Sequence, residues 1–399
     1  MILRRLRALV VEPDSRNHWQ YTASMVGALA RRGLDVQIAA VFPYQPVDGI
    51  EHIPVVRIGR RRDGGTSLAQ SAYTRLIEHM ERIRGLLRAV RVLRPDVLHL
   101  HGAIGKFDFM YFRLARFFGA RVVCTVHDVG PFKRLDLFNR FRYHAADLII
   151  VHSSNSVTTL VDHYGLKRSK ITELPHASVF STPRDMAWPR ATAIAALGLP
   201  AEARIVLFFG DITRRKGLDL LIDAHALVCR HHPQTHLIIA GEPSEDFGVY
   251  RDRIAQHGLG DRVMIDLRYV PSDRVNLYFS AADIVALPYR AIYQSHVLQW
   301  AYAFGRPVVA TAVGGLGEAV SADGTGLVVG GEDVEALARA ISRLLADGDL
   351  ARSLGDRGLE MTRTKYSWEA VSALLDGAYR SVLGSGADPE ARMLRPADR

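Results

Sequence analysis

The feature that most constrains the fold is a regular alternation between short aliphatic runs and longer segments with helical periodicity. Runs such as LRALVVE (6–12), RIVLFFGD (204–211) and DIVALPY (283–289) are rich in Val, Ile and Leu. Continuous runs of this kind are typical of parallel strands that helices cover on both faces. The sequence therefore predicts an α/β protein with parallel, doubly wound sheets.

The alternation stops once, at the polar and proline-punctuated segment 178–193, and then restarts. We therefore expect two Rossmann-like domains, residues 1–190 and 191–365. A last helix, 366–384, is expected to cross back to the first domain, and the polar tail 385–399 is expected to be disordered. Two facing domains of this type place a ligand cleft between the carboxyl ends of their strands.

Charge is unevenly distributed along the chain. Residues 1–200 hold 29 Lys and Arg against 16 Asp and Glu, a balance of +13, whereas the remainder has a balance of −4. An anionic substrate, an anionic membrane surface or nucleic acid would each explain a basic first half. Nucleic acid is disfavoured, because the basic residues are not interleaved with aromatic ones and no recognition motif is present.

The helix expected over 75–94 carries much of this basic charge. Its apolar stripe is expected to comprise Leu76, Met80, Ile83, Leu87 and Val90, as in a helix that covers a sheet. A solvated basic face would explain the arginines in part. However, Arg75, Arg82, Arg84, Arg88, Arg91 and Arg94 face only two glutamates in the same stretch, which indicates contact with anionic lipid.

No run of 18 apolar residues occurs, so no membrane-spanning helix is expected. The apolar stretch 8–11 is too short for a secretory signal and is expected to be the first strand. Cys124 and Cys229 lie in apolar segments without pairing or metal-ligand spacing, as is typical of reduced, buried thiols. We expect a cytoplasmic protein that rests peripherally on the inner face of the plasma membrane.

The stretch FFGDITRRKGLDLLIDA (208–224) predicts a phosphate site. A strand runs into a turn at Gly210, and Arg214, Arg215 and Lys216 stand just before a helix. Cations next to the free amides of a helix N-terminus bind phosphate groups. A solvated basic loop is the alternative, and the stretch lacks the GxxxxGK[ST] pattern of a P-loop.

A second stretch, LPYRAIYQSHVLQWAYAF (287–304), predicts a helix N-terminus with Ser295 as its N-cap. After the next strand, Gly314 and Gly315 form a predicted glycine turn that permits close backbone approach. In the first half, His127 ends a strand, whereas His99 and His101 are expected to be core or supporting residues. Asn17, His18 and Trp19 lie in the first strand-to-helix loop, where an acceptor site and an N-cap with a packing residue are equally compatible with the sequence.

Together, FFGDITRRKGLDLLIDA, LPY…QS…AYAFGRPVVATAVGG..EAV, TGLVV and DVEALARAI make the chain resemble the family-4 retaining glycosyltransferases, also called group 1, and within them the LPY…QS…AYAFG subgroup. In the first half, YTASMVGALARRGLDVQI, PDVLHLHG and VVCTVHD agree. The resemblance covers about residues 5–380 and is most specific over 205–340. It implies the two-domain GT-B fold and transfer of a sugar from a UDP- or GDP-linked donor to a saccharide acceptor.

The resemblance also implies roles for individual residues. His127, Lys216 and Arg214 would be catalytic, and Asn17, His18 and Trp19 would bind the acceptor. The donor would be bound by Gly210, Arg215, Arg268, Tyr289, Gln294, Ser295, His296, Val297, Gly314, Gly315 and Glu318. No metal and no cofactor is implied, since cations replace the ion at the leaving phosphate. The acceptor is expected to be lipid-linked, in surface or exopolysaccharide synthesis.

The chain departs from the family at several positions. Two glutamates that many members carry around the donor loop are Ile292 and Trp300 here, His296 replaces a glycine of the subgroup, and a Pro-Asn-Gly turn has become Pro175–His176–Ala177. Without a carboxylate at 292, a front-face retaining mechanism is favoured. A nucleotide-sugar epimerase, a sugar phosphorylase and a non-catalytic binding subunit are the alternatives.

Overall fold

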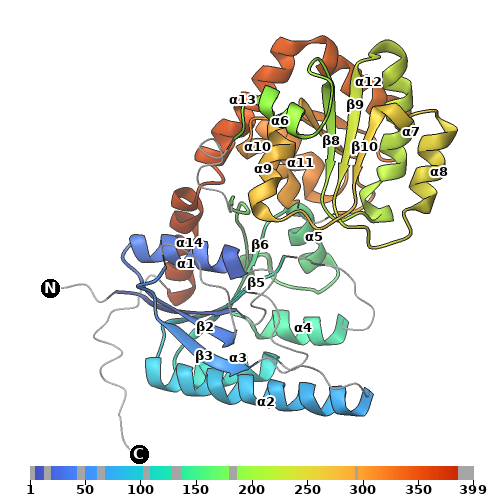
Figure 1. Ribbon diagram of the computed structural model, residues 1–399. Helices are drawn as coiled ribbons and strands as arrows, with labels where there is room; N and C mark the ends of the chain where they lie inside the picture. Colours follow the sequence, from blue (N-terminus) through green and yellow to red (C-terminus); the bar gives the residue numbers. More distant parts are fainter. Residues whose placement is uncertain are drawn as a thin grey trace, which may run out of the picture. The chain divides into compact units, whose positions relative to one another are not determined.

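A computed structural model describes most of the chain, which forms two compact units (Figure 1). Unit 1 comprises residues 1–179 together with 368–399, and unit 2 comprises residues 180–367. Asn17, His18, Gln294 and the tail 385–399 lie outside the described residues, which are 5–12, 19–42, 50–60, 68–101, 108–127, 129, 136–178, 187–292 and 295–384.

Unit 1 contains a seven-stranded sheet in which every pairing is parallel, in the order β3-β2-β1-β4-β5-β6-β7. The chain starts in the middle of the sheet, runs outward to β3 and returns beside β1 with β4, so the sheet is doubly wound, as predicted. Its strands are β1 (Arg7–Glu12), β2 (Asp35–Phe42), β3 (Val55–Arg60), β4 (Val97–His101), β5 (Arg121–Thr125), β6 (Leu148–Val151) and β7 (Ile171–Glu173).

Two cores lie on opposite faces of this sheet. Helices α1 (Trp19–Arg31) and α14 (Trp368–Leu383) cover one face. The other face is covered by α2 (Leu68–Leu93), α3 (Asp108–Phe117), α4 (Asp136–Ala145) and α5 (Ser154–Asp162), as Figure 1 shows. Helix α14 follows unit 2 in the sequence yet packs on α1.

Unit 2 has a six-stranded sheet, again parallel in every pairing, in the order β10-β9-β8-β11-β12-β13. The chain reverses direction across the sheet between β8 and β11. Its strands are β8 (Arg204–Phe209), β9 (Thr235–Ala240), β10 (Val263–Asp266), β11 (Ile284–Leu287), β12 (Val308–Thr311) and β13 (Gly326–Val329).

Helices cover both faces of the second sheet as well. The residues of α7, α8 and α12 contribute to one core, and those of α9, α10 and α11 to the other. The bounds are α6 (Arg190–Ala196), α7 (Leu218–His231), α8 (Gly248–Gln256), α9 (Ser272–Ala281), α10 (His296–Ala303), α11 (Gly314–Asp323), α12 (Val334–Ala346) and α13 (Gly348–Arg363).

Two local predictions were wrong. The paired glycines do not form a simple turn, because Gly314 and Gly315 begin helix α11. Glycine lowers helix propensity, and here the packing of Leu316 and Val320 in the core overrides it. The buried face of α2 is also rotated from the predicted stripe: Leu86 and Val90 are buried, whereas Met80 is exposed and Leu87 is only half-buried.

Gly85 explains this rotation. A Cβ atom at Gly85 would lie 2.4 Å from the carbonyl oxygen of Ile58 on β3, so glycine lets the helix backbone touch the strand. The helix therefore turns its Gly85 side to the sheet. Met80 and Leu87 of the predicted stripe consequently lie nearer to the surface. Sequence periodicity assigns the buried face of a helix from its apolar side chains. It does not reveal a backbone contact that is possible only because a glycine has no side chain.

We predict that Gly85→Ala destabilises unit 1 by about 1–3 kcal/mol, because the added methyl group meets backbone that cannot move aside. Gly377→Ala is the matched control within α14, where the added Cβ would have nothing within 4 Å. The control is expected to stabilise by up to about 1 kcal/mol through helix propensity. Urea unfolding followed by circular dichroism measures both, and equal shifts of the midpoint would contradict the prediction.

Candidate functional site

The first candidate site lies in unit 2, at the carboxyl ends of β8 and β11. This is where the strand order reverses, the usual position of a ligand crevice in an open α/β sheet. Gly210 follows β8 with φ +93°, and a Cβ atom there would lie 3.0 Å from Nζ of Lys216 and 3.5 Å from Cγ2 of Val297. The phosphate-site motif and the start of α10 are thus brought together around Gly210.

Lys216 is the buried cation of this site. Its side chain is 9% exposed, and burial lowers its pKa to about 8, although Asp211 acts in the opposite direction. Its Nζ lies 5.8 Å from the centroid of the Tyr289 ring, which follows β11. An ammonium group held in a partly dehydrated position is poised to gain a counter-anion.

A network of contacts fixes the Lys216 turn (Arg214–Lys216) to the loop after β11. Arg290 donates to both carboxylate oxygens of Asp219, at 2.8 and 2.9 Å, and to the carbonyl oxygen of Arg214 at 3.0 Å. Burial would raise the pKa of Asp219, but the hydrogen bonds from Arg290 outweigh this and hold it below its usual range. Arg215 donates to the carbonyl oxygen of Ala291 at 3.1 Å. Arg290 and Arg215 therefore support the turn, whereas the exposed Arg214 side chain extends beside it.

The start of α10 forms the second part of the site. Ser295 is the N-cap, as predicted, and its hydroxyl accepts from the Leu298 amide at 3.3 Å. Val297, whose side chain approaches Gly210, belongs to the first turn, and His296 is exposed. Burial raises the pKa of Tyr289 to about 12, so its hydroxyl stays protonated.

The neighbouring glycines, and the residues at the positions of the two missing carboxylates, pack against other parts of unit 2. A Cβ atom at Gly314, which has φ +53°, would lie 2.0 Å from the carbonyl oxygen of Ile292, so the close approach that this glycine permits is to the loop. Trp300 stacks on Phe279 with ring centroids 5.8 Å apart. Gly315 lies in the first turn of α11, and Glu318 is exposed on the same helix.

Arg268 lies after the edge strand β10. Its side chain is exposed and forms an ion pair with Asp266, with Nε 2.8 Å from Oδ1. Tyr278 donates to the same carboxylate. The Arg268 guanidinium is therefore tied to its own strand end, two strands from β8 in the sheet.

In unit 1, the predicted His127 lies two residues beyond β5 and is connected to the core by a hydrogen-bond chain. Its Nε2 lies 3.0 Å from Nε2 of His101, and Nδ1 of His101 lies 2.8 Å from Oγ1 of Thr22. Thr22 donates to Oε2 of Glu12 at 2.6 Å. Glu12, Thr22 and His101 are buried, and burial also lowers the pKa of His99 to about 3. The expectation that His99 and His101 are core or supporting residues agrees with this arrangement.

His127 also has two histidine neighbours that likewise follow strands of the sheet. Ring contacts join it to His152 and His176, at centroid distances of 5.1 and 5.6 Å. These residues follow β6 and β7, and their common position at strand ends was the signal available in the sequence. Trp19 begins α1 and is buried in the core, so of the two roles left open by the sequence the structure supports packing.

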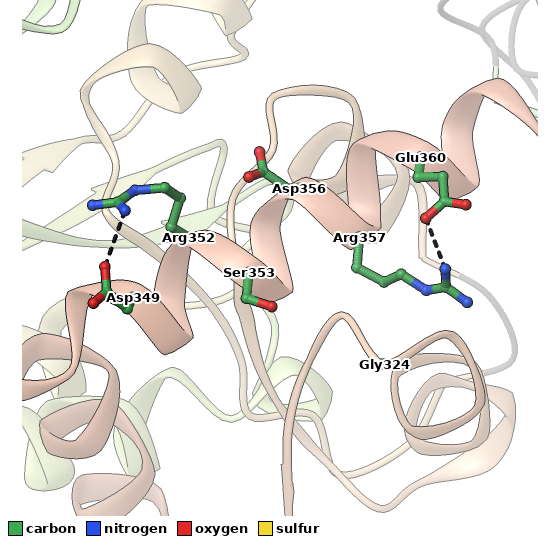
Figure 2. Close-up of a pocket in the computed structure, with 7 residues that line it drawn as sticks. All are labelled: Gly324, Asp349, Arg352, Ser353, Asp356, Arg357 and Glu360. Carbon is green, nitrogen blue, oxygen red and sulfur yellow. Dashed lines mark hydrogen bonds and ion pairs between the residues drawn. The ribbon is translucent and has the colours of Figure 1, made fainter.

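Unit 2 also has an open hollow of about 610 Å³ along α13 (Figure 2). Its charged lining pairs internally: Arg352 donates to Asp349 at 3.0 Å, and Arg357 donates to Glu360 at 2.7 Å. Gly324, in its wall, precedes β13 and so lies at the amino edge of the sheet. The hollow is therefore separate from the strand ends that carry Lys216.

Comparison with known families agrees with this architecture. Residues 19–177 match the family model of Glycosyltransferase Family 4, and residues 189–361 match that of Glycosyl transferases group 1. The chain belongs to this family of glycosyltransferases. The first match lies within unit 1 and the second within unit 2, so each compact unit contains one of the two family domains.

Individual relatives and solved structures are similar over different lengths. D-inositol 3-phosphate glycosyltransferases of Corynebacterium glutamicum and Mycobacterium leprae are 33% and 34% identical, over 60% of this chain. The match spans only 58% and 55% of those relatives. Sucrose-phosphate synthase from Thermosynechococcus elongatus has a TM-score of 0.72 at 24% identity, covering 96% of this chain and 100% of its own. HepE from Anabaena, solved with UDP-glucose, has a TM-score of 0.70 at 18% identity, covering 94% and 100%. These likenesses establish the GT-B fold.

We predict that nucleoside diphosphate binding weakens as the pH rises through about 8. The Lys216 side chain carries a positive charge below that pH and loses its proton above it. The terminal phosphate of the ligand has a pKa of about 6 and is therefore fully ionised over the range from pH 8 to 9. Calorimetry with UDP and GDP should show a loss of affinity of about fivefold between pH 8 and 9, because the protonated fraction of Lys216 falls from about one half to about one tenth.

Lys216→Arg is the matched control, because its guanidinium stays charged across this range. The variant should bind more weakly at pH 7, owing to the changed head group, but without the loss between pH 8 and 9. The same pH slope in both proteins would show that another group titrates.

Proposed function

We propose that the protein transfers a sugar from a nucleotide-diphosphate donor to an anionic acceptor, with retention of anomeric configuration. The observation that carries the proposal is the buried Lys216 ammonium at the strand-order reversal of unit 2, beside Gly210 and the first turn of α10. A cation beside the N-terminus of a helix suits a diphosphate. Family membership supports the same class of reaction.

The leaving diphosphate gains negative charge as the glycosidic bond breaks, and a fixed cation stabilises that charge more in the transition state than in the ground state. We assign this role to Lys216 and the N-terminus of α10, with Arg214 as a further cation. The positions of the two missing glutamates hold Ile292 and Trp300, which are packed against protein. We therefore favour a front-face reaction, in which the leaving phosphate takes the proton of the acceptor hydroxyl and no covalent glycosyl-enzyme forms.

The acceptor is proposed to carry phosphate. Relatives are named D-inositol 3-phosphate glycosyltransferases, which favours a small phosphorylated polyol. A lipid-linked saccharide, the acceptor expected from the basic first half, would present phosphate too. The two acceptors are separated by assaying transfer to D-inositol 3-phosphate and to a lipid diphosphate saccharide.

We predict that Lys216→Met lowers the rate of sugar transfer by about 10²-fold or more, the usual cost of losing one stabilising group at a developing anion. A panel of UDP- and GDP-sugars is assayed for nucleotide release and for product, and NMR of the product reports the anomeric configuration. Arg352→Met, in the separate hollow of Figure 2, is the control and should keep full activity.

Three outcomes would count against the proposal. Unchanged transfer in Lys216→Met would remove the role of the ammonium group, and an inverted product would remove the retaining mechanism. A covalent sugar on an Asp or Glu after quenching would replace the front-face reaction with a double displacement.

A lipid surface is proposed as the second partner, on the face of unit 1 formed by α2, α3 and α4 (Figure 1). No helix within the described residues is long and apolar enough to cross a bilayer. However, Phe117 on α3 is 83% exposed and Leu137 on α4 is 61% exposed, and Arg84, Arg88 and Arg91 are exposed on α2, the helix that α3 contacts. Large apolar side chains next to arginines are typical of surfaces that rest in a headgroup region.

We predict salt-sensitive flotation of the protein with vesicles that contain anionic lipid. Replacing Arg84, Arg88 and Arg91 with Gln should weaken binding by about 3 kcal/mol, or roughly 100-fold, at about 1 kcal/mol per cation. Phe117→Ser should weaken it independently of salt. Val249→Ser, which alters an exposed side chain on α8 of unit 2, is the control. Flotation unaffected by the arginine changes would exclude this face.

A further inference from the structure

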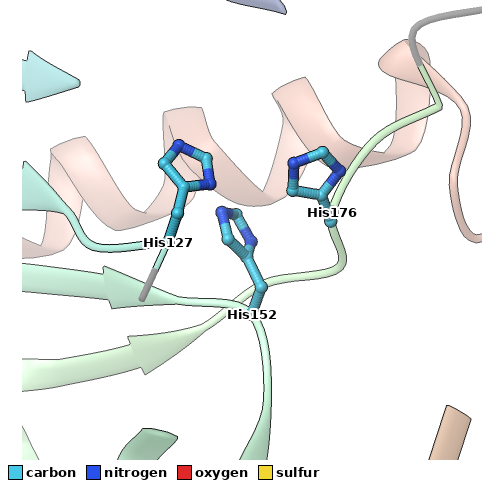
Figure 3. A group of neighbouring side chains, drawn as sticks. All are labelled: His127, His152 and His176. Atoms are coloured by element: carbon cyan, nitrogen blue, oxygen red, sulfur yellow. The ribbon is translucent and has the colours of Figure 1, made fainter. Parts of the chain in front are cut away.

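Three histidines gather at one edge of the unit 1 sheet. His127, His152 and His176 follow β5, β6 and β7, which are neighbours in the sheet, so parallel pairing brings the three together. One ring nitrogen from each lies within 4.8 Å of the others. Figure 3 shows that each ring turns a nitrogen toward the space between the three.

Hydrogen bonds to the protein orient two of these rings. Nδ1 of His152 lies 3.0 Å from the carbonyl oxygen of Leu174 and must donate to it, which makes Nε2 the nitrogen with the lone pair. Such a second hydrogen bond, from ligand ring to backbone carbonyl, is the usual support of a metal-binding imidazole.

The chain behind His127 acts in the same way. Thr22 donates to Glu12, so its oxygen accepts from Nδ1–H of His101. When His101 is neutral, its Nε2 accepts from Nε2–H of His127 at 3.0 Å, which leaves the lone pair of His127 on Nδ1. A buried carboxylate thus orients His101 and, through it, His127.

We propose that His127, His152 and His176 bind one zinc-type divalent cation through three neutral imidazoles, with the fourth position open to water or to an oxygen of a ligand. Zinc binds histidine nitrogen at about 2.0–2.1 Å, so tetrahedral ligands lie about 3.3 Å apart. Binding of the ion therefore requires the rings to rotate from the present separation of up to 4.8 Å to that value. Neutral imidazoles leave the ion with its full charge, which suits an anionic oxygen in the open position.

The sequence predicts no metal, on the ground that cations stabilise the leaving phosphate of the donor, whereas the ion proposed here would be bound in unit 1. The proposal does not rest on sugar transfer, since metal binding is measured without donor or acceptor. The other interpretation is a metal-free polar cluster, in which the three rings pack with Tyr21 and contact a substrate hydroxyl. The ring centroids of Tyr21 and His176 lie 4.5 Å apart. Because this packing orders the rings with or without an ion, ring order does not distinguish the two interpretations.

The test uses the full chain after dialysis against a chelator. Calorimetric titration with Zn²⁺ should give one tight site per chain, and Co²⁺ should give the visible absorption of a nitrogen-ligated ion of low coordination number. His176→Asn restores the residue type that the family turn carries and should weaken Zn²⁺ binding more than about tenfold. His152→Gln should do the same, and His101→Gln should weaken binding by about 10–100-fold as a positioning residue.

His231→Asn is the matched control, because this exposed histidine lies at the end of α7 in unit 2. Circular dichroism confirms that each variant is folded, and UDP binding confirms that unit 2 is intact. Absence of a stoichiometric site in the unaltered chain would overturn the proposal. A site that survives both His176→Asn and His152→Gln would overturn it as well, since the ion would then be bound elsewhere.

Discussion

Close backbone contact at the carboxyl ends of the unit 2 strands is the constraint on which the candidate donor site depends. A Cβ atom at Gly241 would lie 2.1 Å from the carbonyl oxygen of Gly210, and one at Gly217 would lie 2.0 Å from that of Pro288. Gly217 also has φ +65°, a conformation that favours glycine. The turn that carries Lys216 is thereby pressed between the ends of β8 and β11. Its ammonium group is buried for this reason, and its lowered pKa follows from that burial.

The same geometry operates in unit 1 with different residues. Parallel strands end at one edge, so residues far apart in the sequence meet there, and His127, His152 and His176 do so. In unit 2 the edge holds the buried Lys216 ammonium on a turn supported by Arg290 and Asp219. In unit 1 it holds imidazole rings, of which His127 is connected through His101 to Thr22 and Glu12. In both units, several polar groups at the sheet edge are thus held by hydrogen bonds to the protein.

The fold could be predicted from the sequence because aliphatic runs between helical segments determine a parallel sheet almost by themselves. Strand β3 was missed because Val55–Arg60 alternates with arginine instead of forming an aliphatic run. Lys216 and Ser295 were found because their signals are local, a basic cluster and an N-cap before a helix. The positions of His152 and His176 at strand ends are visible in the sequence, but their association with His127 was not predicted, because it depends on strand order, which no local pattern states.

The loop after β11 shows why a missing carboxylate does not weaken the candidate site. A glutamate at position 292 would stand on the segment whose neighbour, Ala291, binds Arg215, and it would compete with a diphosphate for the same cations. Asp211, on the other side of Lys216, is exposed and accepts from Ser244 at 2.5 Å. Asp219 is paired with Arg290. With these two carboxylates hydrogen-bonded to Ser244 and Arg290, the Lys216 ammonium can attract an anion from solution, as the binding of a leaving diphosphate requires.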